Sequence, residues 1–346
     1  MIRGLLPRLR GGETLTREET ERIVRAMVRG EEPDEDVAAF LTILAERGET
    51  EAELLGGAEA LRAEAVPFRT PAGPLLDTCG TGGDARGTFN ISTAVAFVAA
   101  GAGIAVAKHG NRSVSSRCGS ADVLEALGGE IDLGPDAAAR VLEASGFTFL
   151  FARRYHPAVK RVAAVRERLG IRTLFNWIGP LANPAGASHQ LVGVSDRGRV
   201  EIVARVLSGL GVARALVVHG AGGLDELGLE PGNTAVESAW ATSAAAIETR
   251  AHAIEAQDLG LGMAPPEALR GGDAAENAAI IRSVLSGEPG PRRDAVILNA
   301  AAALWIAEAV PDLRIGVAYA RELIDQGAAA RALERYVAAS RREIGR

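Results

Sequence analysis

Lysine is nearly absent from this chain of 346 residues. Of its 38 basic residues only Lys108 and Lys160 are lysines, so the other 36 are arginines. Cysteine is equally scarce: Cys79 and Cys118 are the only two, which excludes a disulfide framework and favours a reducing compartment. No run of five like charges occurs and the formal net charge is −6, which argues against a nucleic-acid partner.

Long hydrophobic runs are missing as well. The longest, Ala94–Ala107, has 14 residues, which is too short to span a bilayer, and no signal-peptide pattern follows Met1. We therefore expect a cytoplasmic protein with no membrane partner. The 47% hydrophobic and 24% charged residues are typical of a globular protein, and the length predicts about two domains.

The chain changes character near residue 70. Before it, capping boxes beginning at Thr16 and Thr50 and apolar residues at helical spacing predict helices only. A linker with three prolines, 66–74, follows. Short apolar runs then alternate with helical stretches, which predicts an α/β domain with a largely parallel sheet. The expected strands are Leu75–Cys79, Ile104–Lys108, Phe147–Phe151, Gln190–Val194 and Ala215–His219.

A glycine-rich loop follows the first expected strand, with Gly80, Gly82, Gly83 and Asp84 in sequence. Glycines allow positive φ, and successive amides beside a helix N-terminus can bind phosphate, although a plain tight turn has a similar sequence. A dinucleotide site would need an acidic residue about 20 positions further on. No Asp or Glu occurs between positions 85 and 121, which argues against a nicotinamide cofactor.

Three further segments are polar where strands end or helices begin. Thr88–Thr93 can bind an anion or a hydrated cation, or can simply cap the helix that follows. Lys108–Arg117 supplies cations and hydroxyls suited to a diphosphate, or forms a solvated basic loop. The adjacent carboxylates Asp225 and Glu226 suit Mg²⁺, or belong to an exposed turn.

Taken together, these motifs resemble the anthranilate phosphoribosyltransferase family. The resemblance rests on Gly80–Asp84, Asn90–Thr93, Lys108–Arg112, Gly119–Glu125, Asn176–Pro184 and Leu224–Glu226. It implies a small all-helical domain and a large α/β domain with a central, largely parallel sheet, the nucleoside phosphorylase or phosphoribosyltransferase fold that resembles class III. The implied boundaries are 1–69, with helices from 156–184, for the helical domain, and 70–155 with 185–346 for the α/β domain.

The resemblance also implies an activity. The family transfers phosphoribose from 5-phosphoribosyl 1-diphosphate to the amine of anthranilate and releases diphosphate, the second step from chorismate to tryptophan. A homodimer and two Mg²⁺ ions are expected, with Ser92, Asp225 and Glu226 as metal ligands. Gly80, Asn111 and Arg166 are expected to bind anthranilate. The expected sugar-diphosphate residues are Gly80, Gly83, Asp84, Thr88, Asn90, Ile91, Ser92, Thr93, Lys108, His109, Gly110, Asn111, Arg112, Ser113, Val114, Ser115, Ser116 and Ser120.

The sequence departs from the family pattern at three positions. Arg117 and Cys118 stand where lysine and serine are expected, and Trp177 stands where an aliphatic residue is expected. Two alternatives share the fold: a pyrimidine nucleoside phosphorylase, and a non-catalytic relative that binds nucleic acid. The Asn176–Pro184 stretch and the Asp225-Glu226 pair favour the transferase. No covalent nucleophile is expected, so catalysis would rest on positioning and electrostatics.

Overall fold

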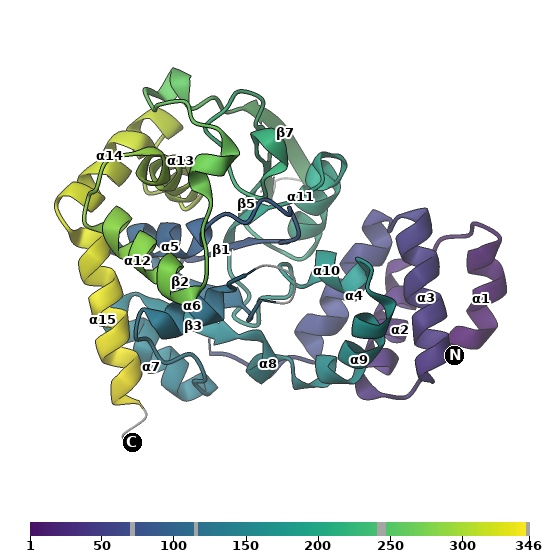
Figure 1. Cartoon of the computed structure of the whole chain (residues 1–346). Helices are drawn as coiled ribbons and strands as arrows, with labels where there is room; N and C mark the ends of the chain where they lie inside the picture. Colours follow the sequence, from purple (N-terminus) through teal and green to yellow (C-terminus); the bar gives the residue numbers. More distant parts are fainter. Residues whose placement is uncertain (70–72, 114–116, 241–246, 344–346) are drawn as a thin grey trace.

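The computed structural model describes residues 1–69, 73–113, 117–240 and 247–343. Helices alone form the first part of the chain, which lies to one side of a larger α/β body (Figure 1). The N-terminal helices are α1 (Ile2–Arg10), α2 (Arg17–Arg29), α3 (Asp34–Arg47) and α4 (Glu51–Ala63). Both predicted capping boxes are present, because Thr16 accepts a hydrogen bond from the amide of Glu19 and Thr50 accepts one from the amide of Glu53.

Two helices from the middle of the chain join this bundle. They are α9 (Lys160–Leu169) and α10 (Leu174–Ile178). Helix α9 packs against α2 and α3, and α10 packs against α3 and α4. Val162, Val165, Leu174 and Ile178 are buried in the same apolar core as the N-terminal helices. The bundle therefore combines segments that are about a hundred residues apart in sequence.

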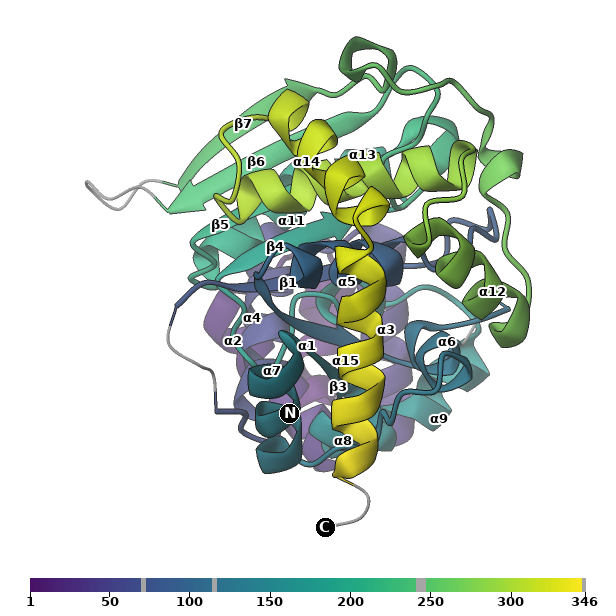
Figure 2. The same cartoon turned by 90° about the vertical axis from the view of Figure 1, so that its left-hand side faces the viewer.

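The α/β body is built on a seven-stranded sheet with the order β3-β2-β1-β4-β5-β6-β7. Strands β1 to β5 are parallel, and β6 and β7 are antiparallel additions at one edge (Figure 2). The strands are β1 (Leu75–Gly80), β2 (Ala105–Gly110), β3 (Phe147–Phe151), β4 (His189–Gly193), β5 (Arg214–His219), β6 (Thr234–Trp240) and β7 (Ile247–Ala253).

Helices cover both faces of the sheet, and the alternation of side chains along each strand explains this. On β5, Leu216 and Val218 belong to the core that includes α5 and α13, whereas Ala215 and Val217 belong to the core shared with α11 and the bundle. The remaining helices are α5 (Ile91–Gly101), α6 (Ser120–Ala126), α7 (Pro135–Ser145), α8 (Ala152–Tyr155), α11 (Val200–Gly209), α12 (Ala274–Leu285), α13 (Pro291–Ile306), α14 (Leu313–Asp325) and α15 (Ala328–Arg342).

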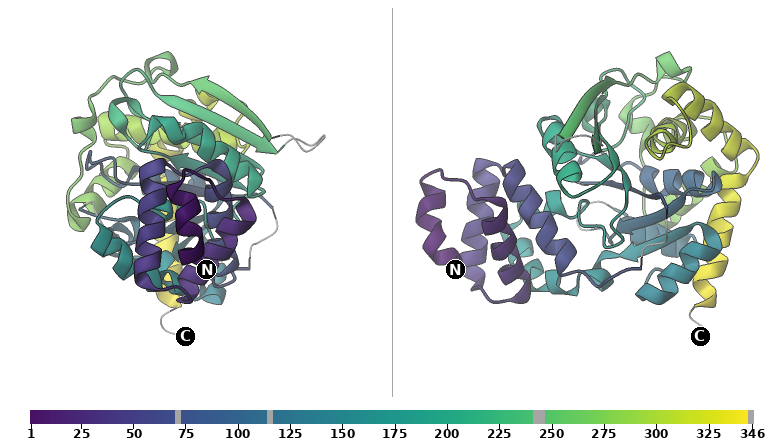
Figure 3. Two further views of the ribbon diagram at one scale, coloured as in Figure 1. Left: turned by 90° about the vertical axis from the view of Figure 1, so that its right-hand side faces the viewer. Right: turned by 180° about the vertical axis from the view of Figure 1, so that it is seen from behind.

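Two largely buried arginines connect the bundle to the α/β body, which the views from the side and from behind show as neighbouring units (Figure 3). Arg62 of α4 donates hydrogen bonds to the carbonyl oxygens of Leu181 and Leu210, at 2.8 and 3.0 Å. Arg199 forms an ion pair of 2.9 Å with Glu49, and the Glu49 side chain is only 2% exposed. These contacts hold the bundle against the α/β body.

The predicted fold class is confirmed, and all five predicted strands are present with ends that differ by no more than two residues. Strand β2 continues through His109 and Gly110, so the basic segment begins inside the sheet rather than after it. The β6–β7 hairpin was not predicted. Within the described ranges, every helix is too short or too polar to cross a membrane.

Candidate active site

The predicted site residues gather at the topological switch point of the sheet. The chain leaves β1 toward β2 on one side and leaves the neighbouring β4 toward β5 on the other. Loops diverge at such a point and leave a crevice at the carboxyl ends of the strands, where open α/β sheets bind ligands. Here the two strands end at Gly80 and Gly193, which are paired in register.

Both strand ends must be glycine because the segment containing Asp225 packs directly on them. A Cβ atom at Gly80 would lie 2.5 Å from Oδ2 of Asp225, and one at Gly193 would overlap the main-chain carbonyl of Asp225. In the loop that follows, Gly82 and Gly83 have φ of +63° and +74°, which other residues rarely adopt. The Gly82 amide donates a hydrogen bond of 2.7 Å to Asp225 Oδ2. The glycine loop and the predicted metal ligand are therefore one structural unit.

Asp84, Asp225 and Glu226 form a cluster of three carboxylates at this point. Burial, reinforced by the neighbouring charge of Asp84, raises the pKa of Asp225 to about 7. Burial and the charge of Asp225 raise the pKa of Glu226 to about 8. Glu226 Oε1 accepts a hydrogen bond of 3.1 Å from the amide of Ser92, so the three predicted metal ligands are brought together. Gathering buried carboxylates costs free energy, which a bound cation would offset.

The donors in this cluster suit Mg²⁺. Two carboxylates and a hydroxyl are hard oxygen ligands, and Mg²⁺ takes its remaining ligands from water and substrate phosphates. Among the described residues there is no group of three or more His, Cys, Asp or Glu side chains placed to enclose a metal ion by themselves. The residues present therefore fit an open Mg²⁺ site that a phosphorylated substrate completes.

Lys108 lies beneath this cluster rather than on a loop. Its ammonium group donates hydrogen bonds to the carbonyl oxygen of Thr78 and, at 3.1 Å, to Oγ of Ser92. The side chain is 2% exposed, and burial lowers the pKa of Lys108, while the charges of Asp77 and Glu226 oppose that shift. Its positive charge thus holds the Ser92 hydroxyl at the N-terminus of α5.

Replacing Lys108 with methionine should weaken the binding of phosphoribosyl diphosphate about tenfold or more, because the cation that holds Ser92 beside Glu226 is lost. It should also lower the melting temperature, since Asp77 would keep a buried carboxylate without its compensating charge. Titration calorimetry and thermal unfolding measure the two effects. The other lysine, exposed Lys160, provides the matched control Lys160→Met, which should change neither quantity. Unchanged ligand affinity in folded Lys108→Met would exclude a role on the diphosphate side.

The predicted residues around the N-terminus of α5 have several different environments. The Asn90 side chain makes no capping hydrogen bond; it donates to the Cys118 carbonyl at 3.3 Å and accepts from Asn277 at 2.9 Å. Ordinary helix capping therefore does not explain Asn90. The side chains of Ile91 and Thr93 are buried, and their amides donate hydrogen bonds to the carbonyl oxygens of Phe89 and Asn90. Thr88 pairs with Arg270 as an isolated β-bridge.

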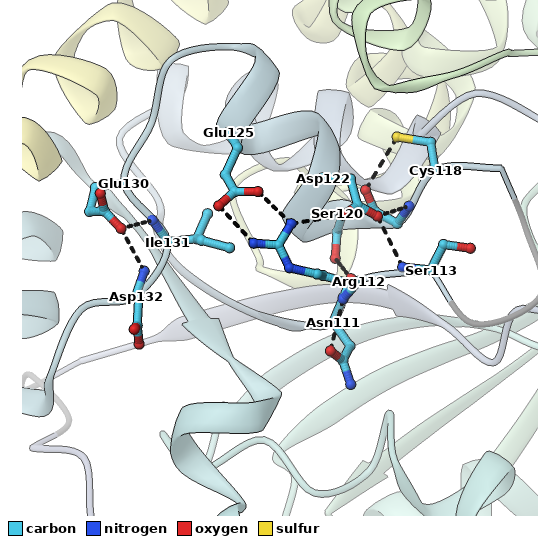
Figure 4. A network of polar contacts seen from close by, with 11 residues as sticks. Asn111, Arg112, Ser113, Cys118, Ser120, Asp122, Glu125, Glu130, Ile131 and Asp132 are labelled. Carbon is cyan, nitrogen blue, oxygen red and sulfur yellow. Dashed lines mark hydrogen bonds and ion pairs between the residues drawn. The ribbon is translucent and has the colours of Figure 1, made fainter. Parts of the chain in front are cut away.

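The segment after β2 is held by one ionic network, which Figure 4 shows from close by. Arg112 pairs with Asp122 at 3.0 Å and with Glu125 at 2.5 Å. Asp122 also accepts hydrogen bonds from the amides of Ser113 and Gly119, and the Ser120 hydroxyl donates to the carbonyl of Asn111. Two carboxylates of α6 therefore already engage the Arg112 guanidinium and raise its pKa. Of the predicted residues in this segment, Val114, Ser115 and Ser116 lie outside the described residues.

This network predicts that Arg112 acts mainly by holding the segment in place. Arg112→Gln should weaken phosphoribosyl diphosphate binding about threefold to tenfold, and Glu125→Gln should have a smaller effect in the same direction. The double variant should be no worse than Arg112→Gln alone, because both changes break the same contact. A double-mutant cycle on the dissociation constants measures this. Strictly additive effects, or tighter binding by Glu125→Gln, would instead indicate that Arg112 contacts the phosphates directly.

Arg166 on α9 is a largely buried cation without an ionic partner among the described residues. Its guanidinium carbon lies 5.4 Å from the centroid of the Phe175 ring, and burial alone lowers its pKa.

On the sheet side, the rings of His109 and His156 are 5.0 Å apart between centroids, and this contact connects β2 to the segment that leads into α9. Burial and the neighbouring His156 lower the pKa of His109 well below its usual value, so the His109 ring is neutral at pH 7.

Sequence reasoning missed two groups at this site. Asn183 donates hydrogen bonds of 2.8 Å to Asp77 and to the carbonyl of Ala107, and so ties the end of the bundle segment to β1 and β2. Arg172 lies against the glycine loop. Asn183 belongs to the Asn176–Pro184 motif and could have been singled out there, whereas Arg172 is one of 36 arginines with no distinguishing pattern around it.

Comparison with known proteins agrees with this architecture. A model of the glycosyl transferase family α/β domain matches residues 72–330, and one of the family's helical bundle domain matches residues 3–65. Anthranilate phosphoribosyltransferase of Roseiflexus castenholzii is 51% identical over 98% of each chain. The enzyme of that name from Thermomicrobium roseum is 51% identical over 97% of this chain and 96% of its own.

Solved structures agree as well. The anthranilate phosphoribosyltransferase of Thermus thermophilus is 46% identical, with a TM-score of 0.90 over 97% of this chain and 99% of its own. The Saccharomyces cerevisiae enzyme in complex with PRPP and Mg shares the fold at 23% identity, with a TM-score of 0.87 over 99% of this chain and 98% of its own. The site geometry, the two matching domain models and these close relatives together show that the chain belongs to the anthranilate phosphoribosyltransferase family.

Proposed function

We propose that this protein transfers the phosphoribosyl group of 5-phosphoribosyl 1-diphosphate to the amine of anthranilate. The products are N-(5-phosphoribosyl)anthranilate and diphosphate, and the reaction is the second step from chorismate to tryptophan. The observation that carries the proposal is a pair of contacts at the switch point of the sheet. Asp225 accepts a hydrogen bond from the glycine loop, and Glu226 accepts one from the amide of Ser92. This arrangement combines a phosphate-binding loop with a carboxylate pair suited to a metal–diphosphate complex.

Substrate binding is divided between the two sides of the crevice in this proposal. The sugar diphosphate lies on the sheet side, against the glycine loop, the N-terminus of α5 and the segment from Lys108 to Ser120. Gly80, Asn111 and Arg166 bind anthranilate. Arg166 supports this assignment, because a largely buried guanidinium without an acidic partner among the described residues matches the fork of a carboxylate.

The chemistry needs no covalent intermediate. Ser92, Asp225 and Glu226 would hold Mg²⁺, expected as two ions, and the metal would supply positive charge to the leaving diphosphate. The aromatic amine of anthranilate is uncharged at pH 7, so it can attack without a strong general base. The protein's own residues position the amine and the sugar and stabilise the charge that develops between them.

The assembly and location belong to the same proposal. The helical domain comprises residues 1–69 and 156–184, and the α/β domain comprises 70–155 and 185–346. Burial of α9 and α10 in the core of the bundle supports this discontinuous division. The protein acts in the cytoplasm as a homodimer, without a nucleic-acid or membrane partner; its two cysteines are buried thiols rather than a disulfide, which suits a reducing compartment.

Loss of anthranilate fluorescence on mixing the protein with phosphoribosyl diphosphate and Mg²⁺ tests the activity. We expect turnover that requires all three components and stops when a chelator removes the metal. Thymidine with inorganic phosphate serves as the comparison reaction, because a pyrimidine nucleoside phosphorylase would consume it. Turnover of thymidine without turnover of anthranilate would overturn the proposal. Salt-dependent DNA binding by a protein that shows neither activity would also overturn it.

A further inference from the structure

Arg172 is the one arginine of residues 170–173, which connect α9 to α10 in the bundle. Its guanidinium carbon lies 4.6 Å from the centroid of the Trp177 ring, within the range of a cation–π contact. Its Nη1 atom donates a hydrogen bond of 2.6 Å to Oγ of Ser195, which follows β4. The guanidinium is thus held by the bundle through Trp177 and by the sheet through Ser195.

The same guanidinium reaches the glycine loop. A Cβ atom at Gly83 would lie 3.0 Å from Nη1 of Arg172, so the absence of a side chain at Gly83 leaves the space that the arginine uses. Gly83 also needs its left-handed φ of +74°. Arg172 therefore stands beside the main-chain groups that form the phosphate-binding loop.

Two nitrogen atoms of the Arg172 guanidinium have no hydrogen-bond acceptor in the part of the chain that the structure describes. Nε and Nη2 of Arg172 are buried and have no hydrogen-bond partner among the described residues. No carboxylate among those residues lies within ion-pair distance of Arg172, although Asp225, Asp196, Glu49 and Asp84 are near enough to act on its charge. A buried N–H without an acceptor is costly, and a guanidinium presents its donors in a fork that fits a planar or tetrahedral oxyanion.

We infer that Arg172 binds an oxyanion of a substrate, from the bundle side of the crevice, with Trp177 and Ser195 as its positioning residues. The inference rests on the proposed function, and the anion is either a phosphoryl group of the sugar diphosphate or the carboxylate of anthranilate. The contact with Gly83 favours the phosphoryl group. In this arrangement one ligand anion joins the bundle to the α/β body.

Variants at position 172 test the inference through binding. We expect Arg172→Gln to raise the dissociation constant of either phosphoribosyl diphosphate with Mg²⁺ or anthranilate about tenfold or more, and to leave the other largely unchanged. Arg172→Lys, which keeps the charge but loses the fork, should lie between wild type and Arg172→Gln. Calorimetry with phosphoribosyl diphosphate and with inorganic diphosphate, and fluorescence titration of anthranilate, identify which anion is bound. Exposed Arg168 on α9 gives the matched control, Arg168→Gln, which should bind both ligands as wild type does.

Trp177→Leu restores the aliphatic residue expected of the family and removes the ring beneath Arg172. We expect it to weaken binding of the same ligand as Arg172→Gln does, but by a smaller factor, and to have no effect in the Arg172→Gln background.

Ligand affinities at wild-type values in folded Arg172→Gln would overturn the inference. It would also be overturned if the only change were a lower Mg²⁺ concentration at half-maximal activity. Arg172 would then act only by offsetting the negative charge of Asp84 and Asp225. A wild-type protein that binds diphosphate through Arg172 but does not consume anthranilate would overturn the proposed function and support the inference.

Discussion

Replacing Arg166 with alanine should raise the KM for anthranilate about tenfold or more, equivalent to about 1.4 kcal/mol or more of lost binding. The KM for phosphoribosyl diphosphate should change little. The expectation follows from the surroundings of the guanidinium, which is largely buried over the Phe175 ring and has no acidic partner among the described residues. An isolated desolvated cation costs free energy in the free protein, so its presence is best explained by a ligand carboxylate that pairs with it.

Steady-state kinetics with each substrate varied in turn measures the difference. Arg168→Ala is the control, because Arg168 is exposed and lies only two residues away on the same helix. The melting temperature of the ligand-free Arg166→Ala variant should equal or exceed that of wild type, since a desolvated charge without an ionic partner is removed. Equal rises in both KM values would contradict the assignment, and so would a variant whose only defect is a lower melting temperature.

Much of the fold could be predicted from the sequence because its signals are local. Two capping boxes and the apolar spacing predicted the N-terminal helices, and continuous apolar runs predicted the buried parallel strands. The β6–β7 hairpin was missed because its strands, Thr234–Trp240 and Ile247–Ala253, are half polar and rich in alanine. Neither segment alternates strictly between polar and apolar residues, so the usual signal of a half-buried strand was missing.

The site could be predicted only in part, because its charged side chains find their partners on neighbouring elements of the fold. The motifs drew attention to Lys108 and Arg112 as cations, but not to the burial of Lys108 beneath Ser92 or to the ion pairs of Arg112 with α6. Such partners depend on tertiary packing and leave no periodic pattern. For the same reason Arg172 could not be distinguished from the other arginines until the bundle and the glycine loop were seen in contact.

Replacing Asp225 and Glu226 together with asparagine and glutamine should abolish activity at low Mg²⁺ and allow partial recovery as Mg²⁺ is raised. Neutral amide oxygens can still accept the hydrogen bonds from the amides of Gly82 and Ser92, so the loop geometry should persist. They are, however, much poorer ligands for a hard cation. Activity measured across a Mg²⁺ titration should therefore show a midpoint about tenfold higher or more, with phosphoribosyl diphosphate held constant.

The stability of the same variant separates a metal site from an ordinary acidic turn. Burial raises the pKa of both carboxyl groups, to about 7 and about 8, so above pH 8 their ionised forms oppose folding in the metal-free protein. The ligand-free double variant should then melt at or above the wild-type temperature at that pH, and the difference should shrink as the pH falls toward the ordinary carboxyl range.

Mg²⁺ with phosphoribosyl diphosphate should raise the melting temperature of wild type more than that of the variant. The double variant Glu248→Gln with Asp258→Asn removes two exposed carboxylates and should behave as wild type in every measurement. An unchanged Mg²⁺ midpoint in the Asp225 and Glu226 variant, with the wild-type thermal shift retained, would mean that these carboxylates do not hold the metal.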